Sequence, residues 1–184
     1  MRSGHFVANE SDLELTQLAA KQLPCEHCGR IGSLNGHGLV RGYGAGGGAG
    51  QLRGRRLYCS NRGRRPGCGR TRMIWLSAVI PGFVARTRTL WKVLSAIARG
   101  QSLRSLWRSS PRDFTLRSVY RWRACLREAL PHLRSRLLQT CDPPTSKSRE
   151  PLTQLREHLR RAFPFAENPA SAFQDGGSTS LLCR

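Results

Sequence analysis

Two cysteine pairs decide the fold: the first lies in Cys25-Glu26-His27-Cys28-Gly29, and the second spans Cys59-Ser60-Asn61-Arg62-Gly63-Arg64-Arg65-Pro66-Gly67-Cys68-Gly69. Each pair leads into a glycine, which lets the backbone turn back on itself. Two cysteine pairs on opposing hairpins supply the four ligands of a tetrahedral metal site. We predict one structural Zn2+ ion in a zinc ribbon, held by Cys25, Cys28, Cys59 and Cys68.

The second pair is wide, with eight residues between its cysteines. His27 and His37 are the alternative ligands within reach, and disulfides are the chemical alternative. The N-terminus shows no signal peptide, so we expect a cytoplasmic chain whose thiols stay reduced, which favours a metal. Hydrophobic content is 39%, which is low for one well-packed core. Small domains with a small hydrophobic core often depend on a metal for stability.

The positive charge is concentrated in the middle of the chain. The net charge of the 184 residues is +20. Residues 25–76 hold ten arginines and one acid, and residues 77–140 hold thirteen basic residues and two acids. Such regions repel themselves unless they meet a polyanion, and nucleic acid is the expected one. Only three of the 31 basic residues are lysines, a bias that a GC-rich genome also explains.

The residues around the cysteines predict a small β domain over 24–80. Strands are expected at Leu39–Tyr43, Leu52–Tyr58 and Thr71–Leu76, with the glycine-rich stretch before Leu52 as a hairpin loop. Residues 1–23 form a leader with a short helix that Ser11 or Asp12 caps; it either packs on the ribbon or is frayed.

In residues 83–140 the apolar residues recur with the helical period of 3.6, in place of the period of two in the strands before them. Thr87 or Thr89 is expected to cap a first helix that ends at Gly100, and a short second helix covers Ser102–Ser109. Thr115 caps a third helix, and Pro131 opens a fourth. A short second helix between two longer ones is typical of a helix-turn-helix.

Residues 141–184 are expected to add little charge, because they hold six basic and five acidic residues. They comprise a linker, an amphipathic helix over Pro151–Phe163 that docks on the bundle or on a partner, and a poorly ordered tail. The fold class is therefore α+β, with a zinc ribbon, then a helix-turn-helix domain and then a C-terminal amphipathic helix.

Arginines on both parts of the chain form the predicted nucleic-acid surface. The third helix is the expected recognition helix, and the long second cysteine pair carries a basic finger. The predicted contact residues are Arg55, Arg56, Arg62, Arg64, Arg65, Thr115, Arg117, Ser118 and Arg121.

The sequence argues against catalysis. Four cysteines close the coordination shell of a zinc ion, whereas a catalytic zinc keeps one position open. Residues 25–140 contain only Glu26, Asp113 and Glu128 as acids, too few for the carboxylate cluster of a two-metal nuclease. We therefore predict a binding protein with no catalytic residues.

The order of these motifs resembles the N-terminal region of insertion-sequence transposase proteins, over about residues 24–130. The resemblance rests on Cys25-x2-Cys28-Gly29, His37-Gly38, Tyr58-Cys59 and Gly67-Cys68-Gly69, and on the phrase Phe114-Thr115-Leu116-Arg117-Ser118-Val119-Tyr120-Arg121-Trp122. In that family a four-cysteine zinc ribbon precedes a helix-turn-helix that binds transposon ends. The chain departs from the family in its wide second pair and in lacking the catalytic nuclease domain.

The resemblance implies an accessory protein, a regulator or a truncated transposase that binds double-stranded DNA, with a transposase or another protein as a further partner. In a bacterium such a protein would be nucleoid-associated. An RNA-binding or ribosome-associated zinc-ribbon protein and a protein-assembly module are the alternatives. A membrane span is not expected, because no run of eighteen apolar residues is present. A membrane surface is not expected as a partner, because its usual signature is one amphipathic basic helix and not charge spread over two regions.

Overall fold

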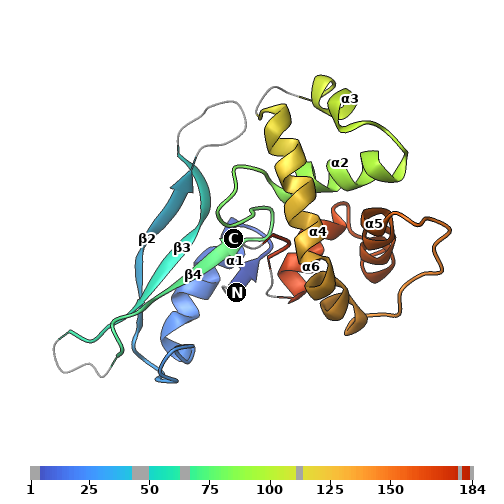
Figure 1. Ribbon diagram of the computed structural model, residues 1–184. Coiled ribbons are helices and arrows are strands. Elements are labelled where there is room, and N and C mark those ends of the chain that lie inside the picture. Colours follow the sequence, from blue (N-terminus) through green and yellow to red (C-terminus); the bar gives the residue numbers. More distant parts are fainter. Residues whose placement is uncertain (1–4, 43–49, 63–66, 111–113, 178–179, 183–184) are drawn as a thin grey trace.

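The computed structural model describes residues 5–42, 50–62, 67–110, 114–177 and 180–182. Within these residues the fold is α+β, with a four-stranded sheet and six α-helices. Figure 1 shows two units side by side: a sheet unit with one covering helix, and a helical unit. The predicted α+β class is confirmed at this level.

The sheet has the strand order β1-β4-β3-β2. Strands β2 (Leu34–Gly42), β3 (Gln51–Cys59) and β4 (Thr71–Leu76) form an antiparallel meander. All three were expected, although β2 starts five residues before the predicted Leu39; Tyr43 lies outside the described residues. Strand β1 (His5–Val7), which was not predicted, pairs in parallel with β4.

Helix α1 (Glu10–Leu18) and the 3-10 turn η1 (Ala19–Gln22) cover one face of the sheet. The helix cap is Asn9, whose side chain accepts a hydrogen bond from the Asp12 N–H at 2.9 Å, so the predicted caps Ser11 and Asp12 were wrong. Asparagine is among the best N-cap residues, which explains the earlier start. Apolar side chains of the helix and strands share one small core: Val7, Leu13, Leu34, Leu57, Ile74 and Leu76.

Helices α2 (Thr87–Ala98), α3 (Leu103–Arg108) and α4 (Leu116–Leu138) begin the helical unit. The Ser102 hydroxyl caps α3, and the Thr115 hydroxyl accepts a hydrogen bond from the Ser118 N–H at 3.2 Å to cap α4. The predicted cap at Thr115 is confirmed.

The start of α2 differs from the prediction. Its N-cap residue is Arg86, which makes no side-chain cap, so Thr87 and Thr89 do not cap the helix. Thr87 is instead buried, and its hydroxyl accepts a hydrogen bond from the Asn168 amide at 3.1 Å. A tertiary contact therefore takes the place of the local cap.

Helix α4 runs through Pro131 without ending, so the prediction of a separate fourth helix was wrong. A proline inside a helix removes one backbone hydrogen bond and costs about 3 kcal/mol. Buried leucines on both sides of Pro131 offset this cost. They are Leu126, Leu130, Leu133 and Leu137. No helix in the described part of the chain is both long enough and apolar enough to cross a membrane.

Helices α5 (Pro151–Ala162) and α6 (Pro169–Gly177) complete the helical core. Of the two alternatives for the amphipathic helix, the structure shows docking on the bundle, because α5 packs between α2 and α4. The expectation of a poorly ordered tail was wrong for the described residues, where α6 follows α5 and the chain remains packed. Buried residues from this region are Leu152, Leu155, Leu159, Phe173, Leu181 and Leu182.

Polar side chains join the two units. The Arg53 guanidinium on β3 donates to the Ile80 carbonyl at 3.1 Å. The buried Gln174 amide on α6 donates to the carbonyls of Ser77 and Val79, each at 2.8 Å. Helix α6 also packs against β1 (Figure 1). These bonds link both units to the segment that joins them.

Candidate metal centre and basic surface

The four predicted cysteines lie together at one end of the sheet unit and can hold a metal ion. Their sulfur atoms all lie within 4.8 Å of one another. The Sγ atoms of Cys25 and Cys68 are 3.8 Å apart, and those of Cys28 and Cys59 are 3.7 Å apart. A tetrahedral ion with metal–sulfur bonds of about 2.3 Å places its ligands about 3.8 Å apart. The donor set therefore fits such an ion.

The backbone turns tightly behind each cysteine pair. The Gly29 N–H donates to the Cys25 carbonyl at 2.7 Å, and the Gly69 N–H donates to the Cys59 carbonyl at 2.9 Å. Both glycines have positive φ, 69° and 73°, which side chains disfavour. The two turns therefore present their thiols in similar ways despite their different sequence spacings.

In the structure the second cysteine pair forms a turn like that of the first pair, despite its wider sequence spacing. The Gly67 N–H donates to the Ser60 carbonyl at 3.0 Å, and the Cys68 N–H donates to the Cys59 sulfur at 3.3 Å. We call this Ser60–Gly67 contact the neck. It closes the backbone so that Ser60 and Gly67 occupy the places of the two middle residues in a Cys-x2-Cys turn. In the sequence, residues 61–66 separate the two residues of the neck.

Replacing Gly67 by alanine is expected to weaken metal binding by about 10–100-fold, as losses around the ligands usually do. A Cβ atom at this position would lie 2.1 Å from the Ser60 carbonyl oxygen, so the neck must open. Competition with a metal-binding dye measures the affinity. Gly176→Ala is the control, because a Cβ there meets only one atom, at 3.9 Å. Equal affinities in the two variants would show that the neck is not needed.

The thiols of the site differ in acidity. Burial acts to raise the pKa of Cys59, but hydrogen bonds from the Ser33 hydroxyl, at 3.1 Å, and from the Cys68 N–H and neighbouring thiols lower it to about 6. A backbone hydrogen bond from Arg70 acts to lower the pKa of Cys68, but burial and the surrounding thiols raise it to about 11. Without a cation the thiol of Cys68, with its pKa of about 11, stays protonated near neutral pH. A metal ion would stabilise four thiolates together.

The alternative ligands lie elsewhere. Among the described residues, the four cysteines form the group with metal-binding geometry, and neither His27 nor His37 belongs to it. Both histidines are exposed, and the His37 ring lies 5.5 Å from the Tyr58 ring. All six described cysteines are free thiols, so the disulfide alternative finds no support there; Cys183 lies outside those residues.

The predicted contact residues of the sheet unit separate onto two faces. Arg55 points toward α1, where it donates to Gln17 and pairs with Glu14 at 3.6 Å. Arg56 follows it on the strand and is exposed on the opposite face, and Arg62 is exposed at the neck. The structure thus assigns Arg55 a contact within the fold. The predicted residues Arg64 and Arg65 lie outside the described residues.

The predicted residues on α4 lie on its first two turns. Arg117 and Arg121 are exposed, and the Arg121 guanidinium lies 5.8 Å from the centre of the Phe83 ring. The hydroxyls of Thr115 and Ser118 are 3.0 Å apart and serve the helix cap. The cap therefore holds the start of α4, while the two arginines project from it.

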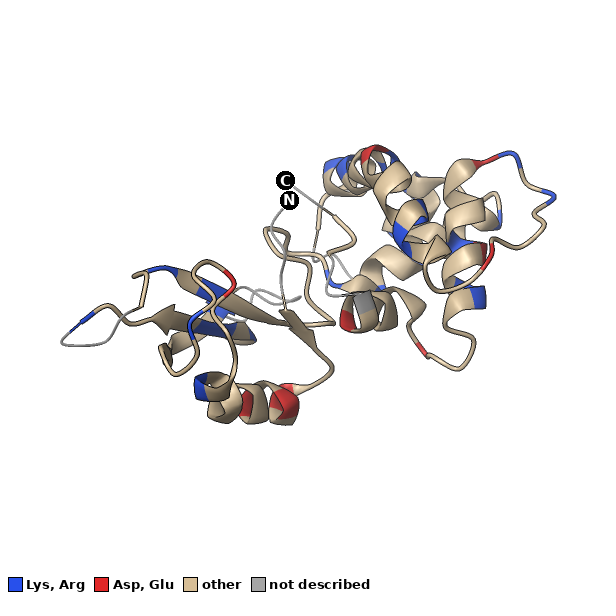
Figure 2. Cartoon of the chain, turned by 90° about the horizontal axis from the view of Figure 1, so that it is seen from below, with Lys and Arg blue, Asp and Glu red and all other residues tan. Residues whose placement is uncertain are grey.

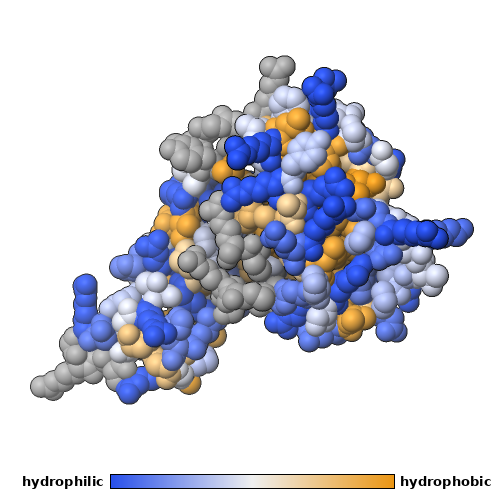
Figure 3. Space-filling view, viewed as in Figure 1, coloured by the Kyte–Doolittle hydropathy of each residue, from blue (hydrophilic) through white to orange (hydrophobic). Residues whose placement is uncertain are grey.

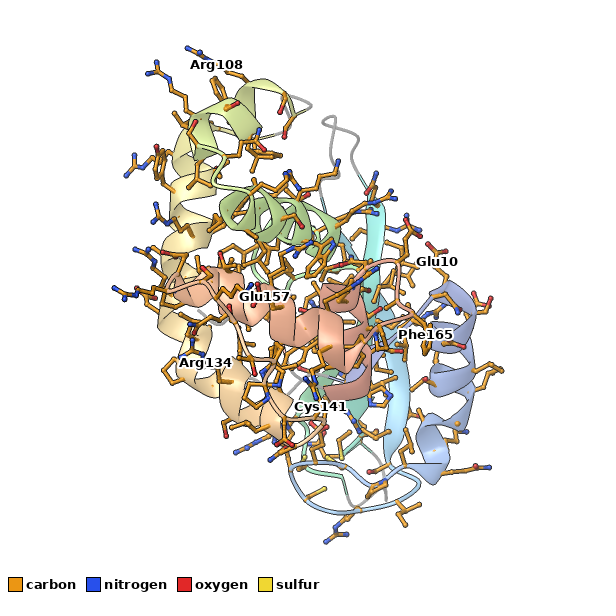
Figure 4. All side chains as sticks on the ribbon, turned by 90° about the vertical axis from the view of Figure 1, so that its right-hand side faces the viewer. Glu10, Arg108, Arg134, Cys141, Glu157 and Phe165 are labelled. Atoms are coloured by element: carbon orange, nitrogen blue, oxygen red, sulfur yellow. The ribbon has the colours of Figure 1, made fainter. Side chains whose placement is uncertain are left out.

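Helix α3 adds two arginines that the sequence did not single out. Arg104 and Arg108 are exposed on this short helix, and Arg108 projects away from the body of the molecule in Figure 4. The exposed Tyr120, half accessible to solvent, lies beside Arg121 on α4. The sequence could have shown that these two arginines are exposed, because helical spacing places Arg104 and Arg108 on the side of the helix opposite Leu103 and Leu106.

Ion pairs are unevenly distributed over the helical unit. Arg127 pairs with Glu150 at 3.1 Å, and Arg88 pairs with Glu167 at 2.7 Å, on the surfaces where residues 141–184 supply carboxylates. In the described part of the chain, no carboxylate pairs with an arginine of α3 or of the first two turns of α4. We call these four residues the α3–α4 arginines: Arg104, Arg108, Arg117 and Arg121.

Comparison of the chain with protein-family models, with curated proteins and with solved structures found no match.

Proposed function

We propose that this protein binds double-stranded DNA through α3 and the start of α4, and that a structural zinc ion holds its sheet unit. The observation that carries the proposal is the distribution of ion pairs. Arg88 and Arg127 on the other surfaces of the helical unit pair with carboxylates, whereas the four α3–α4 arginines lie together on one surface, face solvent and have no carboxylate partner among the described residues. Unpaired positive charge of this density is suited to phosphates.

The arrangement of the helices supports reading in the major groove. A short α3 precedes a long α4, and α4 begins with an exposed, capped turn. In a helix-turn-helix the residues of this turn reach base edges, while the preceding helix contacts the backbone. We assign Arg117 and Arg121 to base edges or adjacent phosphates, and Arg104 and Arg108 to the phosphate backbone. Hydrophilic side chains cover most of the face shown in Figure 3, as a polar partner requires.

Zinc is the metal that we propose for the four-cysteine site. Four thiolates in tetrahedral geometry select zinc or iron, and single structural sites of this kind are usually zinc. Cys25, Cys28, Cys59 and Cys68 would hold the ion and leave no position open for substrate, so its role is to stabilise the fold.

A link to mobile genetic elements is part of the proposal. It is supported by the motif order that resembles the zinc-ribbon and helix-turn-helix region of transposase proteins. On this view the DNA bound is a transposon end, and the protein acts as an accessory factor, a regulator or a truncated transposase. A transposase or another protein would be its further partner, and the cytoplasm its location.

Salt titration of duplex binding tests the proposal. The logarithm of the association constant for a labelled 20-bp duplex is expected to fall linearly with the logarithm of the salt concentration. If the four α3–α4 arginines each contact a phosphate, the slope is about −4. A structured RNA hairpin is expected to bind more weakly. Weak, salt-insensitive binding to both would contradict the proposal, and tighter binding to RNA would favour the RNA-binding alternative.

A further inference from the structure

We propose that the face of the sheet opposite α1 binds one unpaired nucleotide of a single-stranded nucleic acid. The seat is a cleft of about 350 Å³ beside the neck. This proposal rests on the proposed function only in the class of its ligand, which is again nucleic acid. The cleft is a separate surface from the α3–α4 arginines. The cleft is lined by Asn35, His37, Tyr58, Ser60, Arg62 and Thr71.

The strand register brings the lining residues together. Tyr58 on β3 pairs with Asn35 on β2 and with Thr71 on β4, so the three side chains form a row across the sheet. Their neighbours Leu57 and Cys59 are buried on the face that α1 covers. Since side chains alternate along a strand, the row lies on the uncovered face.

The row offers the groups that a nucleotide needs. The Tyr58 and His37 rings lie 5.5 Å apart with an angle of 36° between their planes, and together they give an aromatic surface for stacking. The Tyr58 hydroxyl donates to the Asn61 side chain at 2.6 Å, which fixes the ring position. The Asn35 amide donates to the Ser33 carbonyl at 3.0 Å, and the exposed Thr71 brings a hydroxyl that can reach a base edge. Aromatic stacking plus polar edge contacts is the usual way of binding unpaired bases.

Charge on the sheet unit favours a phosphate at this cleft. The acids of the region lie toward the other face: Glu14 pairs with Arg55, and Glu26 pairs with Arg72 at 2.8 Å. Figure 2 shows the acidic segments of α1 on one side of the sheet. The cleft itself contains Arg62 and no carboxylate among the described residues.

The aromatic ring in the cleft favours an unstacked base over a duplex. A base inside a double helix exposes only its edges in the grooves, so its face cannot reach an aromatic ring on a sheet. A single strand can place one base on the Tyr58 ring while its phosphate lies near Arg62.

Binding of a labelled twelve-residue oligothymidine tests the inference. Tyr58→Leu is expected to lower its affinity about tenfold, the usual effect of losing one stacking contact. Tyr58→Phe, which keeps the ring, is expected to retain the affinity, and so is the control Phe165→Leu, which removes a fully exposed aromatic side chain. Duplex affinity is expected to stay within about twofold in all three variants, since it depends on α3 and α4.

A second variant covers the case in which Tyr58→Leu disturbs the neighbouring Cys59 and loses metal. Arg62→Ala is expected to lower oligothymidine affinity about fivefold, whereas Arg30→Ala, an equal charge change at an exposed position outside the cleft, is expected to leave it unchanged. Equal effects of the two arginine variants would overturn the inference, as would a metal-loaded Tyr58→Leu protein with wild-type affinity.

The two proposals fail separately. Duplex binding without oligothymidine binding overturns the nucleotide seat and leaves the proposed function standing. Oligothymidine binding that depends on Tyr58, with no duplex binding, supports the seat and contradicts the proposed function.

Discussion

Removal of the metal from the four-cysteine site is expected to unfold the sheet unit and leave the helical unit folded. The apolar core of the sheet unit is small, and Cys25 and Cys59 are themselves buried within it. Structural zinc contributes about 10–16 kcal/mol in small zinc domains, more than the stability of an ordinary domain. The helical unit has its own larger core, built from α2 to α6, which contains no ligand of the metal.

Hydrogen exchange read by mass spectrometry distinguishes the two units. After chelation, amides of β2, β3 and β4 are expected to lose protection, while those of α2 and α4 keep it. Cys59→Ser and Cys68→Ser are expected to give the same pattern with less than one metal ion per chain. Cys125→Ser is the matched control, since this partly buried cysteine lies on α4, away from the metal site. Full metal content in both ligand variants would refute the ligand set.

The ligand set could be predicted from the sequence, but the way it closes could not. Cys25 and Cys28 have a spacing that by itself brings two thiols to one ion. Cys59 and Cys68 do not, and they come together only because Gly67 reaches the Ser60 carbonyl. That bond needs a residue without a side chain at position 67. In the sequence, the Pro66-Gly67 pair before Cys68 indicated a turn but not this closure.

The missed elements depend on distant partners. Strand β1 has three residues, too few for a period of two to show, and it exists because β4 accepts it 69 residues later in the sequence. Helix α6 lies in a stretch rich in glycine and serine, where local propensity argues for a loop. Its Gln174 is buried and bonded to the segment that joins the units, which stabilises the helix through tertiary contacts.

Replacing Arg117 and Arg121 together by alanine is expected to lower duplex affinity by at least about 30-fold. Each arginine that contacts a base edge contributes about 1–3 kcal/mol, and each phosphate contact adds about one to the salt slope. Both side chains are exposed, so the change is expected to leave the fold intact. Titration of a labelled duplex at several salt concentrations gives the affinity and the slope, which is expected to become shallower by up to about two.

The matched control for this pair is Arg136→Ala with Arg149→Ala. It removes the same two charges from the net charge of +20, but at the far end of α4 and in the loop before α5. Long-range attraction falls equally in both double variants, so any difference between them measures contact at the start of α4. An equal loss in the two proteins would mean that the duplex responds only to overall charge, and α4 would then not be a recognition helix. A loss confined to Arg117 and Arg121 would identify the surface that meets DNA, because the two pairs differ in place and not in charge.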